Sequence, residues 1–302
     1  MTDLRTRLGR YGVFLGRLSL EPAAALRRDA ASIEAMGYRT VWVGEAFGRE
    51  PLTLAAILLA ATERLVVATG IASIWARDAV ATMNAARTLS EAWPGRFVLG
   101  VGVSHPSLVN PRGHDYGRPR TTMASYLKAM RGSRYDGPPP DDPPAVLIAA
   151  LGPRMLELAA SQADGVFTYF VSERHTHQAR AALGPHPVLA VEQAVVLAES
   201  REAARRDADA YVAAYLALDN YRTNLRGLGY PEEAVSGAGS DALFDSLIGW
   251  GDGDMLTTMV RSHLDAGADH VAVQVVTPSS PQGVMDGLSR LAELLKPGEP
   301  AR

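Results

Sequence analysis

The sequence predicts an α/β protein, specifically a (β/α)8 TIM barrel with insertion segments at the carboxyl-terminal mouth of the barrel. Eight short apolar, β-rich runs alternate with longer amphipathic stretches along its 302 residues, an order typical of parallel sheets. The runs TVWV and HVAVQVV are almost continuously apolar, as expected of strands buried on both faces. Similar phrases recur where helices lead into strands, such as AMGYRTVWV and AGADHVAVQ, and this repetition indicates a cyclic arrangement.

The first half of the chain predicts four strands, at residues 12–15, 40–43, 65–69 and 97–101. Between them we expect helices at residues 21–36, 51–61 and 79–92. Pro22 and Pro51 suit the first turn of the first two helices, and Gly37 is placed to end the first. Asp78 is expected to cap the third.

The second half predicts strands at residues 145–149, 165–170, 188–196 and 270–276. Helices are expected at residues 121–131, 153–163, 173–183, 201–217, 255–266 and 281–295. Two Gly/Pro-rich stretches, at about residues 104–144 and 220–253, interrupt the rhythm and are interpreted as insertions within a single domain spanning residues 1–302. An open doubly wound sheet is the alternative fold, but no G-x-G-x-x-G follows the first strand.

Composition excludes several classes of function. The net charge of −3 gives no broad attraction for nucleic acid or anionic lipid. The chain has no cysteine, so disulfides, cysteine nucleophiles and thiolate metal sites are excluded. No apolar run approaches the roughly 18 residues of a membrane span, and residues 1–10 are polar and arginine-rich. We therefore expect a cytoplasmic protein with a small-molecule substrate and no membrane or nucleic-acid partner.

Residues that directly follow strands are the candidates for chemistry, because the active site of a TIM barrel lies at the carboxyl ends of its strands. Glu45 follows the second strand and is either an acid/base or the partner of Arg49 or Arg77, with an ion pair favoured. His105 follows the fourth strand and is held extended by Pro106. Its imidazole is either a proton shuttle near neutral pH or a surface loop residue.

The turn after the fifth strand, Gly152-Pro153-Arg154-Met155, has the outline of a phosphate site. Glycine allows close approach of a ligand, and the amides of Arg154 and Met155 are expected to point outward at the positive end of a helix dipole. The alternative is an ordinary turn with proline at the start of the helix.

Three aromatic residues near strand ends, Phe14, Trp75 and Tyr169, are candidate substrate-binding residues. Trp75 is placed to wall a planar ligand, although it can equally pack on the outer helices. No HExxH motif, EF-hand loop or carboxylate cluster occurs in the sequence, so we expect no metal site.

Several phrases, in order, resemble the luciferase-like monooxygenase superfamily of flavin and deazaflavin enzymes. They are LGRYGVF, GYRTVWVGEAFGRE, RLVVATGIASIWARDAVATMNAARTLSE, GRFVLGVGVSHP and AALGPRMLELAASQADGVFTY. The resemblance covers residues 8–295 approximately. The phrases TGI, GVSHP and AALGPRM resemble more narrowly the branch that uses coenzyme F420.

The resemblance implies a cofactor site. Gly70, Ile71 and Ala72 would back the deazaflavin ring, with a non-proline cis peptide at Gly70-Ile71 or the next bond. Other implied cofactor contacts are Gly102, Val103 and Ser104 at the ring edge and the Gly152–Met155 turn at the phosphate. The insertion near residues 104–144 would cover the mouth, and a homodimer is the expected assembly.

Two departures from the family pattern affect the proton donor. Related deazaflavin enzymes often carry histidine just after the second strand, where this chain has Glu45-Ala46, and some carry glutamate near the place of His105. We therefore rank His105 first and Glu45 second. The leading hypothesis is an F420-dependent oxidoreductase that transfers a hydride to or from a small organic substrate. An FMN-dependent two-component monooxygenase and a non-catalytic flavin-binding barrel are the alternatives.

Overall fold

A closed barrel is the central feature of the computed structural model, which describes residues 3–277 and 280–299. The outermost ends of the expected domain over residues 1–302, with residues 278 and 279, lie outside the described residues. The ring order of the parallel strands is β1 (Tyr11–Phe14), β2 (Thr40–Val43), β3 (Val66–Thr69), β5 (Phe97–Gly102), β6 (Ala145–Ala149), β7 (Gly165–Thr168), β8 (Val188–Val196) and β10 (His270–Val275). Because β10 pairs with both β8 and β1, the sheet closes and the TIM-barrel prediction is confirmed.

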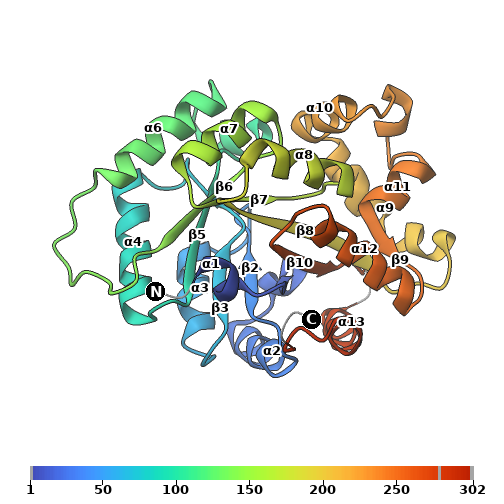
Figure 1. The fold of residues 1–302 in the computed structure, drawn as a ribbon, viewed down its shortest axis with the longest axis horizontal. Helices are drawn as coiled ribbons and strands as arrows, with labels where there is room; N and C mark the ends of the chain where they lie inside the picture. The colour runs from blue at the N-terminus through green and yellow to red at the C-terminus, as the bar shows by residue number, and fades with distance from the viewer. Residues whose placement is uncertain (1–2, 278–279, 300–302) are drawn as a thin grey trace.

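Helices surround the barrel in the alternating order that the sequence predicts (Figure 1). The main outer helices are α2 (Ala23–Ala35), α3 (Pro51–Leu59), α4 (Ala79–Ala92), α6 (Pro119–Arg131), α7 (Pro153–Gln162), α8 (Glu173–Leu183), α12 (Gly253–Asp265) and α13 (Pro281–Leu295). Local signals set their ends. Asp78 accepts a hydrogen bond from the Ala81 amide at the start of α4, and Gly37, with φ of 92°, ends α2 in the left-handed region that glycine tolerates best.

The strand boundaries follow the expected ones closely, with one informative exception. The seventh strand in chain order, β7, ends at Thr168, two residues before the expected end at Phe170. Phe170 adopts a positive φ of 55°, which is incompatible with a strand. This turn redirects the chain at the mouth of the barrel.

The second insertion begins before the expected residues 220–253 and consists largely of regular secondary structure. It contains α9 (Arg201–Leu216), α10 (Asp219–Gly227), a 3-10 turn, α11 (Asp241–Leu247) and the short strand β9 (Ile248–Trp250), which pairs with β8. These elements share a hydrophobic cluster of their own and lie together beside the barrel in Figure 1. Helix α12, which corresponds to the helix expected at residues 255–266, packs against β8 and β10 as the outer helix before the last barrel strand.

The first insertion also has additional short elements, α5 (Pro106–Val109) and a 3-10 turn, before α6. Three further segments were not expected from the sequence: α1 (Leu4–Leu8), a 3-10 turn at Gly16–Leu20, and β4 (Ala72–Ser73), which pairs with β5. Among the described residues, none of the helices is both long and apolar enough to cross a bilayer.

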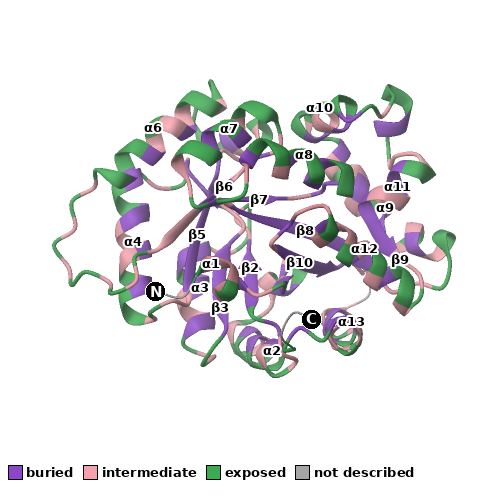
Figure 2. Cartoon of the chain, in the orientation of Figure 1, coloured by how far each residue is buried: buried purple, intermediate pink, exposed green. Residues whose placement is uncertain are grey.

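The barrel strands are the most deeply buried part of the molecule (Figure 2). Inside the barrel, Trp42 stacks on Phe167 with ring centroids 4.2 Å apart and donates a hydrogen bond from Nε1 to His270 Nε2 at 2.9 Å. Trp42 is fully buried and is therefore a packing residue of the barrel interior. These side chains fill the interior, so any ligand site must lie above them, at the carboxyl ends of the strands.

Candidate active site at the barrel mouth

In one half of the barrel mouth, the strands end in glycine or alanine at their inward-facing positions. The inward-facing positions at the ends of β2, β3, β5 and β6 are Gly44, Gly70, Gly102 and Ala149, and we call these four residues the small-residue cradle. Gly70 lies directly over the packed interior, because a Cβ there would be 3.0 Å from the Phe167 ring and 3.1 Å from Trp42. The small residues of the cradle therefore pack closely on the aromatic floor.

Ile71 occupies part of this cradle, immediately after a cis peptide bond between Gly70 and Ile71. The bond lies where the family resemblance implies it. A Cβ on Gly102 would come within 2.5 Å of Ile71 Cγ1, and a Cβ on Gly100 within 2.0 Å of the Thr69 carbonyl oxygen. The glycines of β5 are thus required for the chain after β3 to cross over β5, and Ala72 then pairs with Val101.

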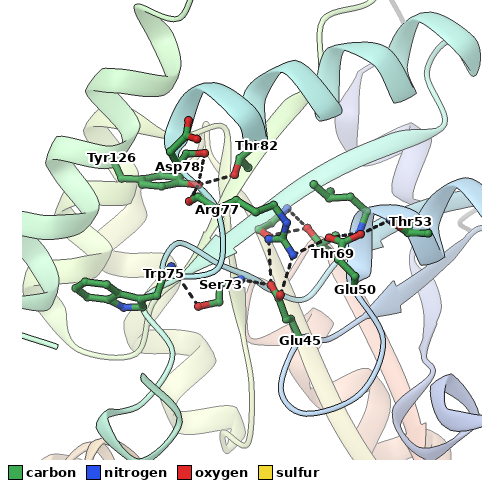
Figure 3. Close-up of polar contacts among 12 residues, drawn as sticks. Glu45, Glu50, Thr53, Thr69, Ser73, Trp75, Arg77, Asp78, Thr82 and Tyr126 are labelled. Atoms are coloured by element: carbon green, nitrogen blue, oxygen red, sulfur yellow. Dashed lines mark hydrogen bonds and ion pairs between the residues drawn. The ribbon is translucent and has the colours of Figure 1, made fainter. Parts of the chain in front are cut away.

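Glu45 anchors this crossing segment from the β2 side (Figure 3). Its Oε2 accepts a hydrogen bond from the Ser73 amide at 2.7 Å. Its carboxylate also receives two bonds from the Arg77 guanidinium, at 2.7 and 3.2 Å. The Glu45 side chain is only 6% exposed. Of the two arginines considered as partners, Arg77 is the one found, while Arg49 bonds the carbonyls of Ser19 and Glu21.

Arg77 also links this anchor to two helices. It pairs with Glu50, the N-cap residue of α3, at 2.6 Å. The Tyr126 hydroxyl of α6 donates to the Arg77 carbonyl at 3.0 Å and lies 2.5 Å from the Thr82 hydroxyl of α4. Burial raises the pKa of Glu50, but hydrogen bonds from Thr53 and Leu52 and the charge of Arg77 outweigh it and lower the pKa overall. Figure 3 shows these groups converging on Arg77.

The turn before α7 has only part of the expected geometry. Gly152 and Arg154 are exposed, and a Cβ on Gly152 would meet nothing within 4 Å. The helix has no side-chain cap. However, the Met155 amide donates to the Gly152 carbonyl at 3.0 Å, so the expectation that it points outward is wrong, because the first turn closes on itself. Pro153 begins the helix as expected.

Trp75 forms part of the wall between β4 and the first insertion. Its Nε1 donates to the Val103 carbonyl at 2.9 Å, and its ring lies 5.9 Å from His114 and 6.2 Å from Tyr116. Tyr116 in turn donates to the carbonyl of Ser104 at 3.1 Å, a residue with a positive φ of 57°. Trp75 is also packed against the main core, so it has both a mouth position and a packing role.

His105 connects the two insertions. It lies at the start of α5, and its Nδ1 is 3.0 Å from Asn220 Oδ1 of α10. Because an amide oxygen only accepts, Nδ1 carries the hydrogen and Nε2 of the neutral ring has the lone pair. Burial lowers the pKa of His105, although the Asn220 bond opposes this effect. At neutral pH the ring is therefore in the neutral form that accepts protons.

Aromatic and polar side chains fill the opposite half of the mouth. Phe14 packs edge-on against Tyr169 with centroids 5.1 Å apart, and Gly44 and Gly70 lie directly against the Phe14 ring. The Tyr169 hydroxyl donates to Gln274 Oε1 at 2.7 Å and lies 3.1 Å from Tyr211 and 3.0 Å from Tyr215 of α9.

A buried carboxyl completes this half. Glu192 of β8 is 1% exposed; its Oε2 accepts from the Phe170 amide at 3.2 Å and its Oε1 lies 3.4 Å from the Tyr211 hydroxyl. Burial raises the pKa of Glu192 to about 8, because the bonds from Phe170 and Tyr211 only partly offset the loss of solvation. We call Glu192, Tyr169, Tyr211, Tyr215 and Gln274 the polar wall.

The sequence-based candidates fall into separate groups in space. Phe14, Gly70 and Tyr169 meet at the floor, Ile71 meets Gly102, and Trp75 meets Val103. His105 and Glu45 have different partners, on the α10 side and the Arg77 side respectively.

Of the residues in the polar wall, the sequence singled out only Tyr169 as a candidate site residue. A signal existed: Glu192 and Gln274 are polar interruptions of the runs VLAVEQAVV and HVAVQV.

Comparison with known proteins agrees with this architecture. Residues 6–270 match the model of the family described as luciferase-like monooxygenase. The 5,10-methylenetetrahydromethanopterin reductase of Methanolobus tindarius is 26% identical over 164 residues, which are 48% of this chain and 50% of the reductase. The chain thus matches about half the length of the curated relatives.

Two solved structures share the fold over almost the whole chain. An F420-dependent secondary alcohol dehydrogenase in complex with an F420–acetone adduct superimposes with a TM-score of 0.76 at 16% identity, covering 97% of this chain and 99% of that one. The oxygenating constituent of 3,6-diketocamphane monooxygenase of Pseudomonas putida, in complex with FMN, has a TM-score of 0.65 at 15% identity, covering 95% and 97%. The shared architecture defines the class of fold as a TIM barrel. The chain belongs to the luciferase-like monooxygenase family.

Proposed function

We propose that this protein is an F420-dependent oxidoreductase that transfers a hydride between the deazaflavin and a small organic substrate. The observation that carries the proposal is the small-residue cradle. Gly44, Gly70, Gly102 and Ala149 place no long side chain at these strand ends, and the Phe14 ring and Ile71 pack closely against the glycines. A planar ring would rest on this surface of small and apolar residues. The relatedness to a methanopterin reductase and the fold shared with an F420-dependent alcohol dehydrogenase support the deazaflavin in particular.

Residues on the β5 and β6 side would hold the rest of the cofactor. Val103 and Ser104 follow Gly102 and would line the ring edge. The open surface at Gly152, the α7 N-terminus and the exposed Arg154 side chain would receive a phosphate, since helix N-termini and arginine both favour anions. Met155 would contribute side-chain contact and not its amide, which is already bonded.

The cofactor, when bound, supplies the hydride, and the protein provides orientation and the accompanying proton. Glu45 holds Ser73 and Arg77, and so keeps the segment that crosses the cradle in place. This arrangement suits a positioning role better than an acid/base role. His105 has a neutral ring with Nε2 as the acceptor, which suits it to receive a proton when a substrate is oxidised. Phe14, Trp75 and Tyr169 would contact the substrate.

FMN is the second candidate cofactor, because a barrel of the same fold holds it in the diketocamphane monooxygenase. A glycine and alanine cradle does not discriminate between two ring systems of similar size and shape. In that case the protein would be the oxygenating component of a two-component monooxygenase, with a reductase as its partner.

Titration with oxidised F420 and, separately, with FMN tests the proposal. Calorimetry measures affinity, and tryptophan quenching reports on the mouth through Trp75. We expect F420 to bind more tightly than FMN, and Trp75→Phe to remove much of the quenching while leaving the calorimetric affinity close to that of the unchanged protein. Tighter binding of FMN would favour the monooxygenase. Binding of neither would contradict the proposal, and binding of F420 without turnover of any hydride donor or acceptor would favour the non-catalytic barrel.

A further inference from the structure

The polar wall is a network of hydrogen bonds around the buried Glu192 carboxyl. Its hydroxyl hydrogens can be counted. Tyr169 donates to Gln274 Oε1, so its oxygen accepts from Tyr211 and Tyr215. A tyrosine has one hydroxyl hydrogen, and Tyr211 cannot give the same hydrogen to Tyr169 and to Glu192. The geometry lets Tyr211 donate either to Tyr169 at 3.1 Å or to Glu192 Oε1 at 3.4 Å. When Tyr211 donates across the shorter contact to Tyr169, a protonated Glu192 can donate across the longer one.

The surroundings of Glu192 favour this neutral form. Among the described residues, the titratable groups that act on Glu192 are Tyr169 from the β7 end, Tyr211 and Tyr215 from α9, and Tyr221 from α10. From β10 the paired residue is the apolar Ala272. No cation pairs with Glu192 in the described part of the chain, so its charge would be uncompensated in a buried place. The second oxygen is held by the Phe170 amide.

The network reaches the mouth through Tyr169. The Tyr169 ring packs on Phe14, which in turn lies against Gly44 and Gly70 of the cradle. The hydrogen-bonded chain runs from Glu192 through Tyr211 to the Tyr169 hydroxyl, and the Tyr169 ring packs beside the floor on which a ring would rest. Chains of hydrogen-bonded groups of this kind can pass protons between a buried acid and a ligand.

We propose that Glu192 stores a proton that passes through Tyr211 and Tyr169 to the substrate as the hydride is transferred. This inference rests on the proposed function. Reduction of a substrate C=O or C=C bond takes one hydride from the reduced deazaflavin and one proton from Tyr169. Tyr211 then reprotonates Tyr169, Glu192 reprotonates Tyr211, and the resulting carboxylate regains its proton from solvent. In this inference Tyr169, in place of His105, exchanges the proton with the substrate, and Glu192 and Tyr211 are positioning residues that act through it.

Infrared spectroscopy of protein labelled with isotopic glutamate tests, without any substrate, whether Glu192 is protonated. The difference spectrum between the unchanged protein and Glu192→Gln should contain a protonated carboxyl band at neutral pH. Glutamine has nearly the shape of a protonated glutamate and keeps an oxygen for the Phe170 amide, so the fold should survive. Absence of this band would overturn the proposal.

Exchange of the carboxyl hydrogen in heavy water tests the relay. The band should shift quickly in the unchanged protein and several-fold more slowly in Tyr211→Phe and Tyr169→Phe, because each variant removes one link. Tyr230→Phe is the matched control: Tyr230 lies in the same insertion but bonds Ser246, and its variant should exchange like the unchanged protein. Equal exchange rates in all four proteins would overturn the relay. Glu192 would then serve only to hold the turn at Phe170 through the hydrogen bond from the Phe170 amide.

Turnover measurements distinguish a failure of this inference from a failure of the proposed function. With any substrate that F420 turnover identifies, Glu192→Gln should lose about 100-fold or more in kcat, the lower range for a general acid. Its pH profile should lose the ionisation that limits the unchanged enzyme on the alkaline side, while F420 affinity is unchanged. Failure of F420 and FMN to bind would contradict the proposed function and the delivery step with it. Binding and turnover with an unaltered profile in Glu192→Gln would overturn the relay alone.

Discussion

At the scale of the residue, the Glu45–Arg77 contact determines whether the segment after β3 stays in place. Arg77→Met would leave a carboxylate that is 6% exposed without its cation, and breaking a buried pair costs about 3 kcal/mol. Glu45→Gln should cost less, since glutamine can still accept from the Ser73 amide. Urea unfolding measures the free energies.

The control for this pair is Arg222→Met, because Arg222 pairs with Asp219, which is 87% exposed. That variant should leave the unfolding free energy unchanged. The double variant Glu45→Gln with Arg77→Met should recover part of the loss from Arg77→Met, because no buried charge remains. A loss in Arg77→Met no larger than in Arg222→Met would contradict the anchor.

Replacement by alanine should have very different effects on stability at Gly100 and at Gly152. Gly100→Ala puts a Cβ within 2.0 Å of the Thr69 carbonyl oxygen, and overpacking of this kind should lower the unfolding free energy by about 3 kcal/mol. The Cβ of Gly152→Ala meets nothing within 4 Å, and Gly152 has an ordinary φ of −80°, so the substitution should cost no more than about 1 kcal/mol as a poorer N-cap.

Gly152→Ala should nevertheless weaken F420 binding in calorimetry, because the methyl group occupies the surface offered to the phosphate. Unchanged affinity would argue against a phosphate at this turn.

At the scale of the element, α5 and α10 meet through His105 and Asn220. Asn220→Ala removes the acceptor that raises the pKa of His105, so burial should lower it further, and the imidazole should titrate at lower pH in NMR. Thr223→Ala, on the exposed side of the same helix, is the control and should leave the His105 titration unchanged. A rise in the His105 pKa in Asn220→Ala would show that the bond does not stabilise the protonated ring.

At the scale of the whole molecule, three buried groups set the dependence of stability on pH. Burial lowers the pKa of His263 and of His270 to about 4, so as the pH falls below about 6.5 the unfolded chain binds protons that the folded chain does not. Stability should fall from about pH 6.5 to about 4, by up to about 3 kcal/mol for each histidine.

Glu192 acts in the opposite direction. Its pKa is raised from 4.5 to about 8, so its contribution to stability is full below pH 4.5 and is lost as the pH rises through 8. The two histidines outweigh the one carboxyl on the acid side, and the unfolding free energy should be highest near pH 6.5. Denaturant midpoints measured across this range check the curve. Glu192→Gln should flatten the alkaline decline and make the acid-side fall steeper between about pH 6.5 and 4.5, where Glu192 opposes the two histidines. An alkaline decline that persists in this variant would contradict the assignment.

The amino-acid sequence was enough to predict the eight-strand barrel, its strand ends to within two residues and, by resemblance, the family and a cis peptide at Gly70-Ile71 or the next bond. These features depend on local periodicity, turn residues and contiguous phrases, all of which are present along the chain. The folded structure was needed to show that the cis bond is Gly70-Ile71, that Glu45 pairs with Arg77 instead of Arg49, that α9 belongs to the insertion, and that the Met155 amide is bonded. It also brought Glu192, Tyr169 and Tyr211 together. Their side chains come from three elements, and closure of the barrel with docking of α9 is what makes them neighbours and removes the water that would otherwise ionise Glu192.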